Sequence, residues 1–598
     1  MPPGSGAPGS MRDNEMAEAT IHWISGPVLR ARTSERFHVS DAVLVGPGKY
    51  LGEVIRVDTD GIVAQIYEDT TGMRPGIGLV GTGRRLSVRL RPGLLGKIFD
   101  GLLRPLASMP GDVIRPGMQR AEAETFTFRP LVPDGASVEA GQIIGEFDTP
   151  NACEKYLVPP GIAGKVERIV REGEYRDDET LCVLVDAGGS KIPLSSGHDW
   201  PVRVQRPVRR RLPPGEPLVT GQRIIDTLFP VARGGRAALP GGFGTGKTIL
   251  QENLAKWSDA DVIVYVGCGE RGNEMAEVLN EFPKLEDPRS GRPLLDRTVI
   301  IANTSNMPVA AREASIYTGI TVAEFFRDQG LHVALLADST TRWAEALREI
   351  SGRLGELPGE HGFPAYLSSR LAEFYERAAH VETLGGDRGS VTVIGAVSPP
   401  AGDFSEPVTN QTKRYVRCFW ALDRDRAQAR FFPAIHPLTS YSEDVEALAP
   451  WWQSQGNPDW LRHRSMILAL LDRRARLERM ARIVGKDALP PRQQLTLLCA
   501  DLVNESLLRQ SAFSPVDRVC SPQRQTELLR VVLRFVERAE QALESGIDLE
   551  AIKAMPVLRR LQRASEEIPE AKLDRFRILM RGLDDEFDQL TKDSARAR

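Results

Sequence analysis

Residues 239–250 read Leu-Pro-Gly-Gly-Phe-Gly-Thr-Gly-Lys-Thr-Ile-Leu, in which a glycine is followed by four residues and then by Gly-Lys-Thr. This spacing is that of a phosphate-binding loop. Its glycines, Gly241, Gly242, Gly244 and Gly246, allow the backbone to curl with positive φ, so that successive N–H groups face phosphate oxygens. Because apolar residues follow at helical spacing, the loop should open a helix whose N-terminus favours anions. A flexible glycine-rich turn is the simpler alternative.

Two side chains of the loop could serve a nucleotide directly. Lys247 would bring positive charge near the β- and γ-phosphates, and the Thr248 hydroxyl could ligate Mg²⁺. Downstream, residues 331–338 are typical of a buried strand that ends in a carboxylate. Asp338 would hold the metal through its water shell, although it could instead cap the next helix. Together the two motifs predict an NTP-binding core.

The segment 267–274, Gly-Cys-Gly-Glu-Arg-Gly-Asn-Glu, carries the charges expected to face this loop, just past a strand that ends at residue 266. Glu270 is the candidate general base or water-positioning residue. Arg271 could neutralise charge on the γ-phosphate, and Glu274 could reach a metal-bound water. Taken as isolated residues, Glu270 and Arg271 would ordinarily form a surface ion pair. Only their place between the two nucleotide motifs favours a catalytic role.

Two further residues near these motifs are ambiguous. Cys268 is more consistent with a small packing residue than with a catalytic thiol, because no histidine accompanies it. Arg342 follows Asp338 by four residues. It could orient Asp338, contact phosphate or form a structural ion pair.

Composition limits the classes of protein that fit. At 598 residues the chain should form three or four domains, and 41% hydrophobic and 26% charged residues are ordinary for a soluble globular protein. The formal charge of -3 gives no reason to expect nucleic-acid binding. Six scattered cysteines suit reduced thiols in a cytosol, and no apolar run approaches the roughly 20 residues that span a bilayer. Five arginines in 203–211 are expected to form a solvated linker or a subunit-contact strand.

The N-terminal part of the chain divides into three blocks. Residues 1–18 lack a signal-peptide pattern and are expected to be a disordered leader. Residues 19–92 alternate short apolar runs with turn signals about every ten residues, which predicts a small β-barrel. Residues 110–200 are punctuated by glycines and predict an inserted β-rich domain without a catalytic constellation.

The rest of the chain predicts a nucleotide-binding domain and a helical domain. Residues 93–109 and 201–444 should form the P-loop α/β domain, with its ligand at the carboxyl ends of parallel strands. Residues 445–598 predict a C-terminal helical bundle whose charged tail frays. The fold class is therefore multidomain α+β. The expected strands are 261–267, 298–302, 331–337 and 391–397, and the expected C-terminal helices are 461–482, 491–510, 523–545 and 571–590.

With these residues in hand, the chain resembles the catalytic A subunit of V/A-type rotary ATPases over nearly its whole length after the leader. The most specific segments are the phosphate loop itself and residues 221–230, 266–275, 337–353, 358–367 and 398–407. The block at 110–200 also resembles the insertion that distinguishes this subunit from its F-type β counterpart.

The resemblance implies Mg²⁺ with ATP or ADP and a heterohexamer in which A-type and B-type subunits alternate. It further implies a central rotor stalk, a peripheral stalk and a membrane-embedded sector that conducts H⁺ or Na⁺, with this subunit on the cytoplasmic face. An arginine finger is expected from the neighbouring B-type subunit. The family assigns Lys247, Thr248, Glu270, Arg271 and Asp338 the roles argued above.

The resemblance also places three aromatic rings around the nucleotide: Phe243, Phe432 and Phe513. From their residue type and surroundings alone, all three would be core residues. The chain departs from the family pattern at Gly242 and Thr245, where Pro and Ser are expected, and these changes bear on affinity more than on activity.

Two further positions have no assigned role, and two alternative functions remain. Ala401 replaces an expected Gly, and Asp444 has no functional account. A non-catalytic nucleotide-binding subunit is one alternative function, which the intact Lys247, Glu270 and Asp338 argue against. A related hexameric motor, either a protein-export ATPase or a nucleic-acid translocase, is the other. The block at 110–200 disfavours both motors.

Overall fold

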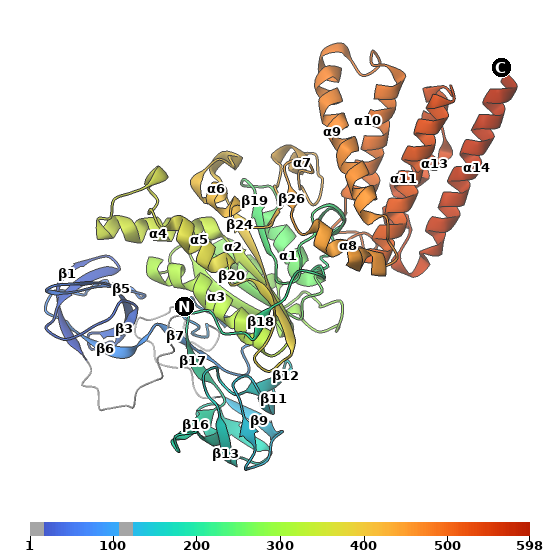
Figure 1. Cartoon of the computed structure of the whole chain (residues 1–598). Helices are drawn as coiled ribbons and strands as arrows, with labels where there is room; N and C mark the ends of the chain where they lie inside the picture. The colour runs from blue at the N-terminus through green and yellow to red at the C-terminus, as the bar shows by residue number, and fades with distance from the viewer. Residues whose placement is uncertain (1–16, 107–123, 598) are drawn as a thin grey trace, which may run out of the picture.

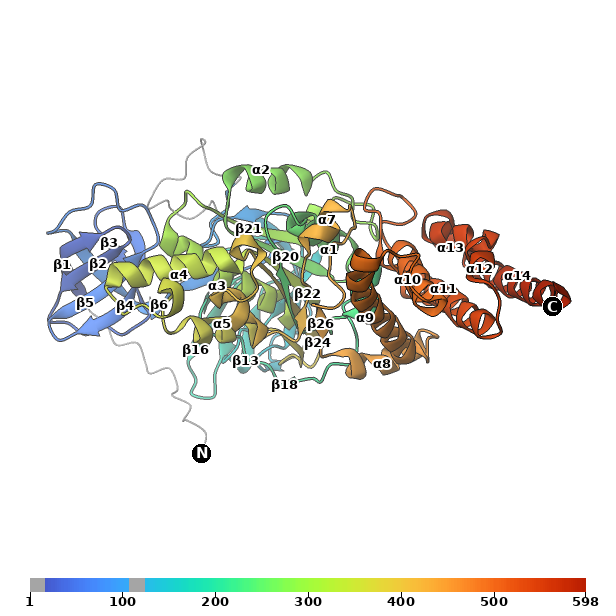
Figure 2. The same cartoon turned by 90° about the horizontal axis from the view of Figure 1, so that it is seen from above.

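The computed structural model describes residues 17–106 and 124–597. A β-barrel lies at one end, a parallel sheet covered by helices lies in the middle, and a helical domain lies at the other end (Figures 1 and 2). Of the leader expected for residues 1–18, residues 1–16 lie outside the described residues. The predicted end at residue 18 is wrong by one residue, because strand β1 begins at Glu18.

The first domain is a closed barrel of antiparallel strands, as predicted. In β2, Leu29 and Ala31 are buried while Arg30 and Arg32 are exposed, because successive side chains of a strand point to opposite faces. The strands follow the order β1-β2-β5-β4-β3-β6 around the barrel. Their bounds are Glu18–Ser25 (β1), Val28–Arg32 (β2), Asp41–Val45 (β3), Tyr50–Asp58 (β4), Gly61–Ile66 (β5) and Gly78–Arg85 (β6).

The second β-rich block is a sandwich of two four-stranded sheets, with strand orders β10-β13-β15-β16 and β12-β11-β9-β14. Its core contains Phe128, Phe147 and Tyr156, whose ring centroids lie 5.2–5.7 Å apart. The antiparallel pair β7 and β17 connects this block to the barrel. The bounds are Ser87–Leu90 (β7), Thr125–Pro130 (β9), Ser137–Val138 (β10), Ile143–Asp148 (β11), Cys153–Leu157 (β12), Gly164–Ile169 (β13), Gly173–Arg176 (β14), Thr180–Val185 (β15), Lys191–Ser195 (β16) and His198–Pro201 (β17).

The central sheet has the order β26-β25-β19-β24-β22-β20-β21-β8; off this path, β23 pairs with β24, and β18 pairs with β23. The neighbours from β19 to β8 pair in parallel, and all four predicted strands are present. The short apolar run before the phosphate loop also forms a strand, β19. The bounds are Ile98–Phe99 (β8), Arg210–Arg211 (β18), Arg236–Pro240 (β19), Val262–Glu270 (β20), Thr298–Thr304 (β21), His332–Asp338 (β22), Ala379–Glu382 (β23), Arg388–Val397 (β24), Cys418–Phe419 (β25) and Tyr441–Ser442 (β26).

Helices bury both faces of this sheet. Alternate residues of β20 enter different cores: Ile263 packs on the side of α1 and α2, and Val264 packs on the side of α3, α4 and α5. This explains why the strands read as continuous apolar runs. The bounds are Lys247–Trp257 (α1), Gly272–Glu281 (α2), Val309–Asp328 (α3), Thr340–Leu354 (α4), Leu367–Tyr375 (α5), Pro407–Lys413 (α6) and Arg424–Gln428 (α7).

The C-terminal domain is helical, as predicted, but the sequence missed three of its helices and misjudged two ends. The α-helix expected over 491–510 ends at Val503, and a π-helical turn, Asn504–Leu508, follows it. Helix α14 extends to Ala597, past the expected end at residue 590, and it packs on α11 through Phe535 and Phe587. The helices are α8 (Val445–Ser454), α9 (Trp460–Val484), α10 (Pro491–Val503), α11 (Pro522–Glu544), α12 (Leu549–Lys553), α13 (Pro556–Glu567) and α14 (Asp574–Ala597). Within the described residues, none of the helices has the length and apolar character that a bilayer crossing requires.

The prediction of a solvated linker is wrong for the first half of the arginine run, whereas Arg210 and Arg211 form the exposed strand β18. Arg203 pairs with Glu53 of the barrel at 3.0 Å and with Glu313 of α3 at 2.7 Å. Arg206 is buried and pairs with Asp328 at 2.6 Å. These ion pairs join the barrel to the central domain and hold the linker against α3, so the charges serve internal contacts.

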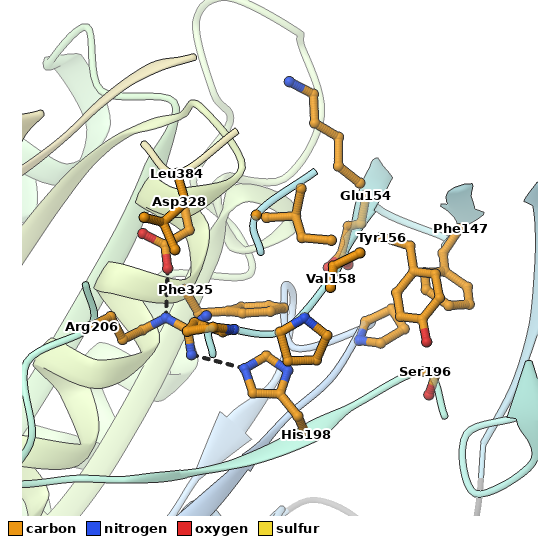
Figure 3. A pocket seen from close by; sticks show the side chains of 16 residues that line it. Phe147, Glu154, Tyr156, Val158, Ser196, His198, Arg206, Phe325, Asp328 and Leu384 are labelled. Carbon is orange, nitrogen blue, oxygen red and sulfur yellow. Dashed lines mark hydrogen bonds and ion pairs between the residues drawn. The ribbon is translucent and has the colours of Figure 1, made fainter. Parts of the chain in front are cut away.

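A cavity of about 30 Å³ lies where the sandwich meets the central domain (Figure 3). Arg206 lies beside it and donates to Asp328 and to His198 Nε2, the latter at 2.9 Å. Glu154 of β12 also lines it: its Oε1 accepts from the Gly93 N–H at 2.9 Å, while its Oε2 is buried without a hydrogen-bond partner in the described structure. Burial raises the pKa of Glu154 to about 7. The cavity has room for ordered water and not for a nucleotide.

Glu154 should make stability depend on pH. Its folded-state pKa lies above the usual 4.5, so the folded state holds a proton that the unfolded state releases, and stability falls as pH rises toward 7. Glu154→Gln should therefore raise the free energy of unfolding at pH 8.5 by about 1–3 kcal/mol, and by much less at pH 5. Calorimetry of the full chain at both pH values checks this, with the exposed Glu139→Gln as the control. Equal changes at the two pH values would contradict the assignment.

Candidate active site

The phosphate loop connects the end of β19 to the first turn of α1. Gly244 and Gly246 have φ values of 76° and 84°, a left-handed conformation that favours glycine. The expectation of positive φ is wrong for Gly241 and Gly242. Gly241 is required for a different reason, since a Cβ there would lie 2.5 Å from Thr245 Oγ1. At Gly242 the nearest atom would lie at 3.6 Å, which leaves room for a side chain.

The hydroxyl of Thr245 closes the loop by donating to the Gly242 carbonyl at 2.8 Å. The ammonium of Lys247 folds back over the loop and donates to the carbonyls of Gly241 at 2.6 Å and Gly242 at 3.3 Å. Burial lowers the pKa of Lys247, although Asp338 and Glu270 oppose that shift. The loop thus presents a partly desolvated cation at the N-terminus of a helix. The sequence predicted Thr245 as a nucleotide-binding residue but not the hydrogen bond that its hydroxyl makes within the loop.

The buried carboxyl group of Asp338 and the half-buried carboxyl group of Glu270 lie at the ends of adjacent parallel strands, because β20 and β22 pair with Gly267 opposite Asp338. Burial raises the pKa of Asp338 to about 6, against the opposing effect of Lys247. Burial, the charge of Asp338 and a hydrogen bond with Glu274 raise the pKa of Glu270 to about 8. The cluster therefore carries fewer negative charges at neutral pH than its composition suggests, and it favours a cation brought by a ligand.

Glu270 is the last residue of β20, not a loop residue after a strand that ends at 266. The strand is longer because it continues to pair with β21 past an irregularity at Cys268, which brings Glu270 opposite Thr304. Tyr265, in the middle of β20, donates its hydroxyl to Asp338 Oδ2 at 3.4 Å. Sequence reasoning missed this contact, although a tyrosine in an otherwise apolar strand was a usable signal.

The arginines near the loop have ordinary partners. Arg342 donates to Glu345 Oε2 at 2.9 Å, so the structure shows the ion pair among the three alternatives. The guanidinium of Arg271 lies 5.6 Å from the centroid of the Phe243 ring, and within the described structure the surface ion pair with Glu270 that was the alternative to a catalytic role is not formed. Burial raises the pKa of Cys268 to about 12, which excludes a reactive thiolate and supports its packing role.

The three aromatic residues differ in exposure. Phe243 is 85% exposed and Phe513 is 95% exposed, so the prediction that they are core residues is wrong. Both sit on loops that offer nothing to cover them within the described chain, and exposed rings of this size often mark binding surfaces. Phe432 is half-buried against the core shared with the C-terminal helices.

Two departures from the family pattern have structural counterparts. Ala401 has a φ of 54°, a conformation that suits glycine better, and it precedes Gly402, which lies beside Gly242 of the phosphate loop. Asp444 is buried and accepts from Arg417 Nε at 2.6 Å and from the Ala232 N–H at 3.2 Å. Asp444 is therefore a structural anion at the base of the central sheet.

A phosphate loop on a parallel sheet, between an antiparallel barrel and a helical domain, defines a nucleotide-binding protein. Three family profiles match: "ATP synthase alpha/beta family, nucleotide-binding domain" over residues 221–442, "C-terminal domain of V and A type ATP synthase" over 449–553, and "ATPsynthase alpha/beta subunit barrel-sandwich domain" over 119–203.

Individual relatives narrow this class. The chain is 49% identical to the A subunit of the A-type ATP synthase of Methanopyrus kandleri, covering 96% of this chain and 98% of that protein. It is 49% identical to the V-type ATP synthase alpha chain of Halothermothrix orenii, covering 95% and 98%. This chain belongs to the family of A subunits of A-type and V-type ATP synthases.

A solved structure shares the fold. The assembled ATPase EscN from the type III secretion system of enteropathogenic E. coli matches with a TM-score of 0.63 at 23% identity, over 86% of this chain and 100% of that one. At this identity the likeness concerns the fold alone.

The hydroxyl of Thr245 should matter for nucleotide affinity. Thr245→Val keeps the shape of the side chain but removes the bond to the Gly242 carbonyl, which is worth about 1 kcal/mol. We expect Mg-ATP to bind about three- to tenfold more weakly to this variant, whereas Thr245→Ser, which keeps the hydroxyl, should bind nearly as the parent chain does. Titration calorimetry checks both, and unchanged affinity of Thr245→Val would show that the bond does not shape the loop.

Proposed function

We propose that this chain is the catalytic subunit in which ATP is hydrolysed or synthesised with Mg²⁺, at an interface with a B-type subunit, coupled to transmembrane H⁺ or Na⁺ transport. The observation that carries the proposal is the meeting of Lys247, Glu270 and Asp338 at the ends of α1, β20 and β22. A positive group for phosphate and a carboxyl group for water are two of the groups that phosphoryl transfer to water uses.

The phosphate loop would bind the triphosphate through its backbone N–H groups, from Gly241 through Gly246, and through Thr245, Lys247 and Thr248. Lys247 now donates to two loop carbonyls and would exchange them for β- and γ-phosphate oxygens. Arg271 and Arg342 would add positive charge as negative charge develops on the γ-phosphate. Phe243, Phe432 and Phe513 would surround the base.

Glu270 would act on the attacking water. Its carboxylate accepts a proton as the water oxygen bonds to the γ-phosphorus and the bond to the ADP oxygen breaks. Burial raises the pKa of Glu270, and the positive charge of Mg²⁺ bound with the nucleotide would favour the ionised carboxylate that can act as a base.

The donor set fits Mg²⁺ held mainly by the nucleotide. Among the residues that the structure describes, no group of three or more His, Cys, Asp or Glu side chains converges to hold a metal ion. Mg²⁺ normally keeps several waters and binds through one or two protein groups and phosphate oxygens. Thr248 would bind it directly, and Asp338 and Glu274 would do so through water. When bound, the ion neutralises charge on the phosphate oxygens.

The exposed Phe243 and Arg271 support a site completed by a neighbour. We propose a B-type subunit that alternates with this one in a hexamer and supplies an arginine finger, which contributes about 10³–10⁵ in rate. The hexamer would contact a central rotor stalk and a peripheral stalk, and would reach the membrane ion-conducting sector on its cytoplasmic face through them. Nucleic acid is not among the proposed partners.

Glu270→Gln tests the role of the carboxylate. Binding of Mg-ATP should be retained, because the amide keeps the shape of the side chain, while turnover in the complex with the B-type partner should fall by about 10²–10⁴. Glu281→Gln, on the exposed face of α2, is the matched control and should leave turnover unchanged. Substantial turnover of Glu270→Gln in a steady-state ATPase assay would remove Glu270 from the catalytic role.

A further inference from the structure

The exposed ring of Phe513 cannot be positioned by its own packing, since it is 95% exposed. Its position depends on the backbone of the turn that carries it, residues 510–517. Asp517 stabilises this turn: its Oδ2 accepts from the Ser511 N–H at 2.8 Å, and the Ser514 N–H donates to Ser511 Oγ at 3.2 Å. The groups that anchor this turn therefore decide where the ring lies.

Gln510 joins this turn to the segment of the second ring. Its backbone N–H donates to the Phe432 carbonyl at 2.8 Å. Its side-chain amide is buried and satisfied on both atoms: Nε2 donates to the Gly221 carbonyl at 2.9 Å, and Oε1 accepts from the Arg223 N–H at 2.9 Å. One residue thus connects both ring-bearing segments to residues 221–223, which precede the strand of the phosphate loop.

Arg223 provides the second anchor. Its fully buried guanidinium forms an ion pair with Asp517 and donates to the Leu507 carbonyl at 2.7 Å and to the Arg509 carbonyl. A buried charge pair of this kind is costly to break from one side, because the remaining charge is left without a partner. Because the guanidinium is planar, it also fixes the relative positions of its acceptors, and each of its three nitrogens donates to a different one.

The segment 220–226 is itself held rigidly. Asp226 is buried and accepts from the Thr220 N–H and the Gly221 N–H at 3.0 and 2.9 Å, and from Gln525 Nε2 of α11 at 3.0 Å. The segment 220–226, which Gln510 contacts, is therefore bonded to both the central domain and the C-terminal helices.

We propose that Gln510 and the Arg223–Asp517 pair are positioning residues for the base of the nucleotide. They hold the Phe432 and Phe513 segments at a fixed separation, and so determine how strongly the chain binds an aromatic base over a bare phosphate chain. The inference rests on the proposed function in that both rings contact the base.

Affinity for Mg-ATP and for Mg-tripolyphosphate, measured by calorimetry on the full chain, separates the base from the phosphates. Gln510→Glu replaces the donor to the Gly221 carbonyl with a carboxylate oxygen. We expect it to weaken Mg-ATP binding roughly tenfold, as loss of a buried hydrogen bond does, and to leave tripolyphosphate binding unchanged. Gln494→Glu is the matched control, since Gln494 donates to the Leu489 carbonyl at 2.9 Å in the same helical domain. It should change neither affinity.

Equal weakening of both ligands, or no change in either, would overturn the proposal and leave Gln510 a structural residue. If Gln510→Glu does not fold, Arg223→Lys gives the same test, because it keeps the charge opposite Asp517 but loses the bonds to Leu507 and Arg509. Equal weakening of ATP and tripolyphosphate binding, or no change in either, would again overturn the proposal.

A double-mutant cycle with Phe513→Ala separates this inference from the proposed function. If Gln510 acts through the ring, Gln510→Glu should add little to the loss of ATP affinity that Phe513→Ala already causes. Full additivity would overturn the positioning role. Unchanged ATP binding in Phe513→Ala alone would instead contradict the proposed role of that ring.

Discussion

The parallel pairing of β20 with β22 brings Glu270 and Asp338 to the same edge of the sheet, beside Lys247 of the phosphate loop. Burial disfavours every charge in this cluster, so the two carboxyl groups have raised pKa values and the lysine a lowered one. Helices on both faces of the sheet maintain that burial. The cluster is consequently most stable with a ligand that supplies both phosphate oxygens and a cation, which is the chemical form of a nucleotide with its metal.

The helical domain shares a core with the nucleotide-binding domain. One continuous apolar cluster includes Leu239 of β19, Leu250 of α1 and Leu528 of α11. The buried pair Arg223–Asp517 crosses the same boundary. The phosphate loop and the C-terminal helices are therefore supported by one packed core.

Sequence patterns predicted the parts of the molecule that local chemistry determines. The phosphate loop, the four central strands, the barrel and most long helices follow from spacing and apolar periodicity. Features that depend on tertiary contacts were missed: Arg203 is half-buried in ion pairs with Glu53 and Glu313, which come from elements far away in the chain. Gly241 is required by the side chain of Thr245, not by its own φ. Phe513 was expected in the core because residue type predicts burial on average, whereas its turn holds it in solvent.

The most direct test of the catalytic role is ATP hydrolysis by the purified chain, alone and after mixing with the proposed B-type subunit. We expect slow hydrolysis by the chain alone and a rise of about 10³–10⁵ on mixing, together with a hexamer-sized species, because the neighbour completes the site. Formation of the hexamer without any rise in hydrolysis would contradict that role, and would make this chain a nucleotide-binding structural subunit.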